Sequence, residues 1–169
     1  MGMAVSKPTL NLVLPLGISF YTFQTLTYTI DIYRKKLKPE NSLITFASFV
    51  SFFPQLIAGP IERAAKLLPQ IKAKKSFRDI PFEKACYLFA YGFFKKRVIA
   101  DYMVIIVERA YENPNATGIE ILIGLMAFVI QVYCDVSGYA HMARGLAYFL
   151  GIELSPNFNF PFFASNPSD

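Results

Sequence analysis

A segment of 19 residues without a charged side chain runs from Leu43 to Ile61, and proline interrupts it. Pro54 lies in its middle and Gly59-Pro60 lie near its end, so the segment does not have the pattern of one smooth membrane-spanning helix. Short basic stretches flank it on both sides, and such loops stay on the cytoplasmic side of a membrane. Irregular backbone at membrane depth needs protein or a water-filled cavity around it. The pattern therefore predicts a re-entrant segment that lines a polar cavity.

The composition also favours a membrane protein. Hydrophobic residues make up 54% of the 169 residues and charged residues only 17%, whereas soluble domains average about 45–50% and about 25%. The net charge of +5 sits in short blocks between apolar runs rather than on a face with interleaved aromatics, so no nucleic-acid partner is expected. Cys86 and Cys134 lie inside apolar stretches and His141 is the only histidine, so no metal site is predicted.

Several other stretches are predicted to be helical. Residues 10–30 and 119–134 are long enough to span a membrane, and residues 135–151 continue with small residues that permit close helix packing. Residues 82–107 contain three consecutive cations, which are costly in lipid. Either the first half of this stretch lies in the interface or the cations face a wet interior, and the sequence favours the first arrangement. Residues 63–75 predict a short amphipathic helix in the cytoplasmic interface or, equally, a solvated loop.

These patterns together predict an all-α fold class. We expect a polytopic membrane protein with transmembrane helices, a re-entrant or broken segment and interfacial helices. Residues 1–169 are expected to form a single membrane domain.

Four polar residues after the 119–134 stretch invite comparison with a catalytic triad: Asp135, Ser137, Tyr139 and His141. Residues two apart on a helix do not face each other, and no strand–turn–helix nucleophile elbow is present, so a Ser-His-Asp triad is not expected. Asp135 is instead predicted to cap a helix N-terminus or to form one wall of a polar cavity. His141 is predicted to face a polar pocket or the interface.

A second group of polar residues flanks the proline-broken segment. Gln55, Glu62 and Arg63 would touch substrate if this segment lines a cavity, whereas Glu62 and Arg63 would otherwise be interfacial charges in water. Farther along, Arg97 and Asp101 have the i,i+4 spacing of a helical ion pair. Lys96 is five residues before Asp101 and is expected to lie off that helix face.

Four blocks in this order resemble the membrane-bound O-acyltransferase family. They are LPLGISFYTFQTLTYTIDIYR (14–34), FVSFFPQLIAGPIER (49–63), GFFKKRVIAD (92–101) and CDVSGYAHMARGLAYFLGIELSPNFNFPF (134–162). The resemblance covers roughly residues 12–169. It is strongest to the branch that O-acetylates alginate and weaker to the branch that transfers D-alanine to teichoic acid.

The resemblance implies a multi-pass enzyme of the inner (plasma) membrane, with a funnel through the bilayer. Such enzymes transfer an acyl group, often acetyl, to hydroxyls of an exported or cell-surface polysaccharide such as alginate. The implied acyl donor, such as acetyl-CoA or an acyl carrier, lies on the cytoplasmic side, and no cofactor is expected to be resident. The implied partners are membrane lipid, the polysaccharide acceptor and a periplasmic or extracellular acetyltransferase.

The resemblance also bears on the site residues. The catalytic histidine of the family is expected downstream of Asp169, so the chain is predicted to be an internal fragment without catalytic residues of its own and inactive alone. Where relatives commonly read Ser-Gly-Tyr-Ser-Asp, residues 137–141 read Ser-Gly-Tyr-Ala-His, so no catalytic role is transferred to His141. Broken polar segments also occur in transporters, so the alternative is a non-catalytic membrane scaffold or transporter component. The predicted funnel-lining residues are Gln55, Glu62, Arg63, Asp135 and Tyr139.

Overall fold

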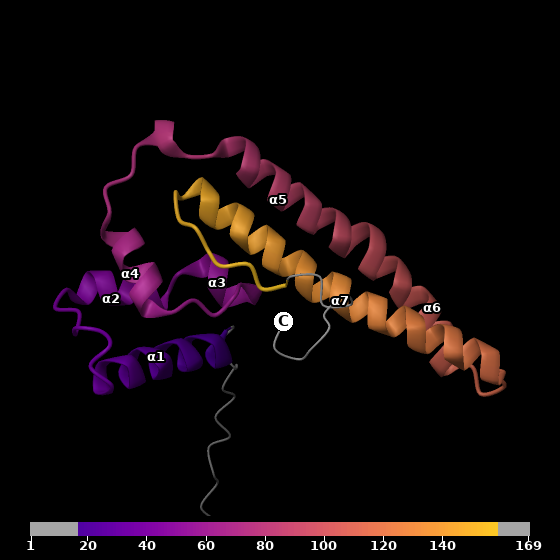
Figure 1. Ribbon diagram of the computed structural model, residues 1–169. Helices are drawn as coiled ribbons and strands as arrows, with labels where there is room; N and C mark the ends of the chain where they lie inside the picture. Colours follow the sequence, from indigo (N-terminus) through magenta and orange to yellow (C-terminus); the bar gives the residue numbers. More distant parts are fainter. Residues whose placement is uncertain (1–16, 159–169) are drawn as a thin grey trace, which may run out of the picture.

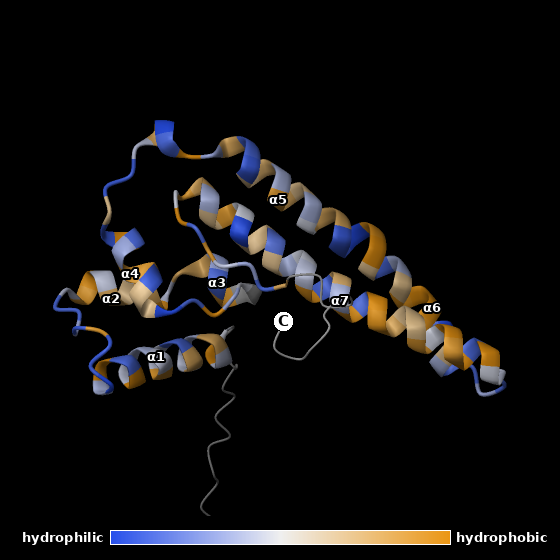
Figure 2. Ribbon diagram, viewed as in Figure 1, coloured by the Kyte–Doolittle hydropathy of each residue, from blue (hydrophilic) through white to orange (hydrophobic). Residues whose placement is uncertain are grey.

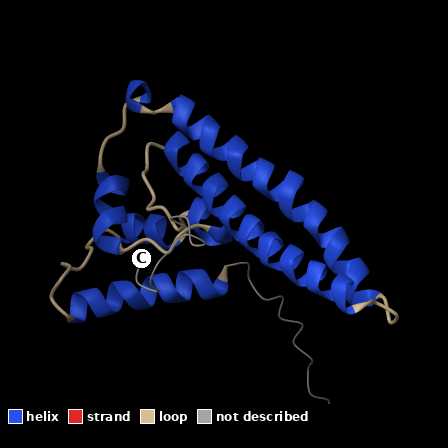
Figure 3. Ribbon diagram, turned by 45° about the vertical axis from the view of Figure 1, so that its right-hand side comes forward, coloured by secondary structure: helices blue, strands red, loops and turns tan. Residues whose placement is uncertain are grey.

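The computed structural model describes residues 17–158, and every regular element in that range is a helix (Figure 3). The all-α prediction is therefore confirmed for this part of the chain. The start of the predicted 10–30 helix and the sequence after Phe158 lie outside the described residues. The helices are α1 (Ile18–Tyr33), α2 (Leu43–Val50), α3 (Phe53–Ala58), α4 (Ala64–Lys72), the 3₁₀ turn η1 (Phe77–Asp79), α5 (Phe82–Phe94), the π-helix η2 (Lys95–Ala100), α6 (Asp101–Glu112) and α7 (Gly118–Phe149).

Two long helical rods lie side by side and form one half of the structure (Figure 1). One rod is the uninterrupted run of α5, η2 and α6, and the other is α7, which returns in the opposite direction. The shorter helices α1 to α4 form the other half, in which α2 packs on α4 and α3 packs on α7. A hydrophobic core that includes Phe49, Leu67, Leu68 and Leu154 joins the helices of this second half to the residues that follow α7.

The helix α7 corrects one prediction. The stretch 119–134 and most of 135–151 form a single helix, Gly118–Phe149, of 32 residues, about 48 Å long at 1.5 Å per residue. Asp135 lies in the middle of this helix, so its prediction as an N-cap is wrong. The helix starts instead at Thr117, whose side chain forms a capping box with Glu120. Asp135 does not compete for the backbone because its carboxylate pairs with Lys96 of the other rod.

Large apolar side chains cover the outside of α7. Among the described residues, α7 is the one helix long and apolar enough to cross a membrane. Its first half is mostly orange in Figure 2. Exposed apolar patches on this scale indicate contact with lipid or with other protein. The exposed side chains in this half include Ile119, Ile121, Leu122, Ile123, Leu125, Met126, Phe128, Val129, Ile130 and Val132.

The two rods approach closely where glycines face each other. A Cβ atom on Gly92 would lie 2.5 Å from the carbonyl oxygen of Gly138, and one on Gly145 would lie 2.8 Å from the backbone nitrogen of Phe89. Neither position leaves room for a side chain. The predicted close packing at small residues of α7 is thus confirmed at Gly138 and Gly145.

The proline-containing segment is broken, as predicted. Helix α2 ends at Val50, and Pro54 belongs to the first turn of α3, where its missing N–H costs nothing. Extended backbone follows from Gly59 to Arg63, and α4 then begins. Residues 64–72 form a helix through Pro69, with Leu67 and Leu68 buried, so these residues are not a solvated loop. The position of this helix in the cytoplasmic interface stays a prediction.

The C-terminus of α1 stores backbone strain that a mutation can release. Lys35 has a φ of 58°, and the Lys36 and Lys35 amides donate to the carbonyls of Asp31 and Ile32, which is a Schellman motif. The equivalent position after α7 is Gly151, with a φ of 68°. A left-handed conformation costs a side-chain-bearing residue about 1–2 kcal/mol.

We therefore expect Lys35→Gly to raise the free energy of unfolding by about 1 kcal/mol, measured by thermal unfolding in detergent. Lys36→Gly removes the same charge at a position without positive φ and serves as the matched control. Equal stability changes in the two variants would contradict the strain at Lys35.

Candidate functional site

A cluster of charged residues lies between the two rods. The Lys96 ammonium lies 2.9 Å from Asp101 Oδ1 and 2.6 Å from Asp135 Oδ1. Arg97 donates to Asp101 Oδ2 at 2.7 Å, which confirms the predicted i,i+4 pair. The two positive charges of this cluster, on Lys96 and Arg97, balance the two negative charges, on Asp101 and Asp135. Since the carboxylates and Lys96 are each about a third exposed or less, removing one partner would leave a poorly solvated charge behind.

The contact between Lys96 and Asp101 shows that one expectation was wrong. At a spacing of i,i+5 the two residues were expected to lie off one helix face. Residues 95–100 form a π-helix, whose hydrogen bonds join residues five apart. The wider turn places Lys96 and Asp101 on the same face, and Lys96 also contacts Asp135 of α7.

Lys95 is buried against α7, with only 7% of its surface exposed. Its ammonium lies 4.7 Å from the ring centre of Tyr91 and 5.2 Å from that of Tyr133, and it donates to Ser137 Oγ at 3.4 Å. The cations at 95 and 96 therefore point toward the second rod. They face the protein interior, as the second of the two alternatives has it, and the position of this stretch relative to the membrane interface stays a prediction.

The candidates Asp135 and Tyr139 meet in this cluster through Lys96. The Lys96 ammonium lies 5.4 Å from the ring centre of Tyr139, on the same side of α7 as Asp135. His141 does not join them, because its Nδ1 lies 2.6 Å from the Ser137 carbonyl oxygen and its ring packs edge-on against Tyr91. The Asp135 carboxylate, the Ser137 hydroxyl and the His141 ring thus contact different groups and do not form a triad.

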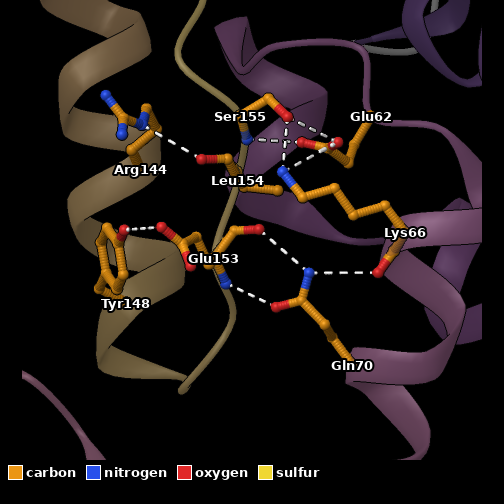
Figure 4. A network of polar contacts seen from close by, with 8 residues as sticks. All are labelled: Glu62, Lys66, Gln70, Arg144, Tyr148, Glu153, Leu154 and Ser155. Atoms are coloured by element: carbon orange, nitrogen blue, oxygen red, sulfur yellow. Dashed lines mark hydrogen bonds and ion pairs between the residues drawn. The ribbon is translucent and has the colours of Figure 1, made fainter.

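A second polar cluster centres on Glu62 (Figure 4). Glu62 is only 4% exposed, and its carboxylate accepts hydrogen bonds from the backbone N–H of Ser155 at 2.6 Å and from Ser155 Oγ at 2.9 Å. The Lys66 ammonium lies 3.6 Å from the same carboxylate and donates to Ser155 Oγ at 2.6 Å. The alternative in which Glu62 is a charge in water is therefore wrong. The sequence could not show this because Ser155 is 93 residues away.

Residues 152–158, called segment 152–158 below, are held on α4 and α7 by further hydrogen bonds (Figure 4). Gln70 exchanges two of them with the backbone of Glu153, at 3.1 and 2.8 Å. Arg144 donates to the Leu154 carbonyl at 3.3 Å. The Tyr148 hydroxyl donates to Glu153 at 2.7 Å and lowers the pKa of that carboxyl below its ordinary value.

An open pocket of about 570 Å³ lies beside Glu62, at the start of α4. Two of the predicted residues, Glu62 and Arg63, line it together with Lys66 and Ser155. Sequence reasoning singled out neither Lys66 nor Ser155 as a candidate. The remaining lining residues are Ile61 and Ala65.

Gln55 lies in a different place. It is 1% exposed, and Gln24 of α1, equally buried, donates to its side-chain oxygen at 3.4 Å and to the Phe49 carbonyl at 2.8 Å. Gln55 does not line the pocket beside Glu62. The five predicted residues therefore fall in three places: the charged cluster, the Glu62 pocket and the buried amide pair.

Glu62→Ala should release segment 152–158. The substitution removes the acceptor of two Ser155 donors, and hydrogen bonds to a charged group contribute about 1.5–3 kcal/mol each. We expect a stability loss of about 2–3 kcal/mol and faster amide hydrogen exchange in segment 152–158. The control is Glu83→Ala, at an exposed carboxylate on α5. Unchanged exchange in segment 152–158 would show that Glu62 does not hold it.

Comparison with known proteins gives several relatives. No family model matches the chain. It is 38% identical over 156 residues to the probable alginate O-acetylase of Pseudomonas aeruginosa, and the match covers 92% of the chain and 30% of that relative. It is 35% identical over 190 residues to the peptidoglycan O-acetyltransferase of Helicobacter pylori, and this match covers 95% of the chain and 36% of that relative. The teichoic acid D-alanyltransferase of Bacillus subtilis is 27% identical over 168 residues. The chain thus spans about a third of the length of these relatives.

Proposed function

This chain is a homologue of membrane-bound O-acyltransferases, and we propose that it supplies part of an enzyme that transfers acetyl groups to a polysaccharide such as alginate. The observation that carries the proposal is 38% identity over 92% of the chain to the probable alginate O-acetylase. The acyl donor in this proposal is a thioester such as acetyl-CoA.

The proposal places the two rods in the inner membrane of a multi-pass protein. Its support is the apolar exterior of α7 together with the balanced charges between the rods. Ionisable groups at membrane depth face a protein interior and pair with one another. The proposal also has α2 and α3 enter and leave the bilayer from the cytoplasmic face, which the break at Pro54 supports.

The proposed reaction is base-assisted acyl transfer. A sugar hydroxyl loses its proton to a general base while its oxygen attacks the thioester carbonyl carbon, and the thiolate leaves. We assign the base to a histidine in the remaining two-thirds of the enzyme. Residues of this chain, among them Gln55, Glu62, Arg63, Asp135 and Tyr139, would frame the path of the substrates. The acetyl group would reach the polysaccharide directly or through an extracellular acetyltransferase partner.

A chimera tests this function. Residues 12–158 would replace the matching segment of the Pseudomonas aeruginosa alginate O-acetylase, in a strain that lacks its own copy. We expect acetyl esters on the exported alginate at a measurable fraction of the wild-type level. Membrane insertion, followed by a fluorescent fusion and size-exclusion chromatography, shows whether the chimera folds.

The alternative is a non-catalytic scaffold or transporter component. A chimera that inserts and is monodisperse, but yields alginate without acetyl esters, would contradict the transferase. Secreted alginate of normal amount in that strain would then favour the scaffold.

A further inference from the structure

The positive charge of this chain is concentrated at one end. Residues 62–84 contain seven lysines and arginines against three acids, a net charge of +4 out of +5 for the whole sequence. These residues form the end of the connection before α4, then α4, η1 and the start of α5, which lie together at one end of the structure (Figure 1). A concentrated positive field raises the local concentration of anionic ligands.

The pocket beside Glu62 opens within this basic end. Two cations, Arg63 and Lys66, line it, and Glu62 is the one acid among its described lining residues. The Glu62 carboxylate accepts hydrogen bonds from Ser155 and pairs with the Lys66 ammonium, so its negative charge compensates the positive charge of Lys66. The Arg63 guanidinium has no hydrogen-bond or ion-pair partner within residues 17–158, and the residue is exposed at the pocket. The uncompensated charge of the pocket therefore belongs to Arg63.

The chemistry of Arg63 selects the type of ligand. A guanidinium presents a planar fork of N–H donors that matches two oxygens of a phosphate, and it remains charged at every physiological pH. The pocket volume of about 570 Å³ is within the range of about 300–1,000 Å³ typical of small-molecule sites. A phosphate group with part of an attached nucleotide or pantetheine arm fits such a space.

We propose that this pocket binds the phosphate groups of the acyl donor, with Arg63 as the contacting cation and Lys66 beside it. This inference rests on the proposed function. Glu62 is a positioning residue in this site, because it fixes Lys66 and the Ser155 wall of the pocket. The donor thioester would extend from this anchor toward the helical rods.

Binding of coenzyme A to the full chain in detergent tests the site. We expect Arg63→Gln to weaken binding about tenfold, as measured by isothermal titration at low salt. The matched control is Arg78→Gln, which removes the same charge from the same basic stretch outside the pocket. We expect it to change the dissociation constant less than about twofold. Equal effects of the two variants, or no binding to the wild-type chain, would overturn the proposal.

Two further ligands identify the group that is bound. Pantetheine lacks phosphate and should bind at least about tenfold more weakly than coenzyme A, with no difference between wild type and Arg63→Gln. An oligomer of uronic acid offers carboxylates in place of phosphates. If the oligomer bound more tightly than coenzyme A and lost that affinity in Arg63→Gln, the pocket would belong to the acceptor and the proposal would be wrong.

The acetylation chimera separates this inference from the proposed function. Arg63→Gln in the chimera should raise the KM for acetyl-CoA about tenfold and leave kcat unchanged at saturating donor. An active chimera whose KM does not respond to Arg63→Gln would retain the function and exclude the site. A chimera that inserts without activity would exclude the function itself.

Discussion

Replacing Gly92 by leucine should force α5 away from α7 and prevent the two rods from packing. A Cβ on Gly92 would lie 2.5 Å from the Gly138 carbonyl oxygen and 2.7 Å from the Met142 backbone nitrogen. These are backbone atoms of a continuous helix, so they cannot rotate away as a flexible side chain would. Overpacking of this kind costs about 3 kcal/mol or more. We expect loss of monodisperse protein on size-exclusion chromatography and loss of acetylation in the chimera.

The sequence offers a matched control for Gly92. Nothing lies within 4 Å of a Cβ on Gly118, at the start of α7. Gly118→Leu adds the same apolar side chain to an open helix end and should leave stability within about 0.5 kcal/mol, as surface substitutions generally do. A stable, active Gly92→Leu chimera would mean that the two rods are not held at the observed distance.

Lys96→Met should destabilise the protein by about 3 kcal/mol, because it leaves the Asp135 carboxylate between the rods without its cation. Asp101 retains Arg97, so the damage falls mainly on Asp135. Breaking a partly buried pair costs more than the pair itself contributes, since the remaining charge stays desolvated. Thermal unfolding in detergent measures the loss.

A second substitution should restore part of that stability. In Lys96→Met/Asp135→Asn the unpaired charge is gone, and the double-mutant cycle should recover about 1–2 kcal/mol. Asp135→Asn alone leaves Lys96 paired with Asp101 and should cost less than Lys96→Met. If the double variant were no more stable than Lys96→Met, the two residues would not be energetically coupled.

Features that depend on nearby residues could be predicted from the sequence. The break at Pro54, the Arg97–Asp101 pair and the small-residue contacts of Gly138 and Gly145 each follow from local spacing or residue size. The all-α class follows from apolar stretches of helical length. These signals need no knowledge of the partner element.

Features that depend on distant partners could not be predicted. From the sequence alone, Glu62 is indistinguishable from an interfacial charge, because its partner Ser155 lies beyond the C-terminal end of α7. Asp135 likewise has the pattern of a helix cap in the sequence, whereas in the structure it pairs with Lys96 of the other rod. The contact of Lys96 with Asp101 depends on a π-helix, and no residue type in 95–100 specifies that hydrogen-bond register.

The π-helix also sets where the first rod can change its length. Its turn holds one residue more than a turn of α-helix, so deleting one residue from 95–100 would allow an ordinary α-helix to form there. Because the extra residue is confined to this turn, α6 would keep its orientation relative to α5. Ala110 would stay beside Gly124, and Asp101 would still face Lys96. A deletion elsewhere in the rod would instead rotate the following helix by about 100°, so residues 95–100 are the place where this rod can change its length by one residue.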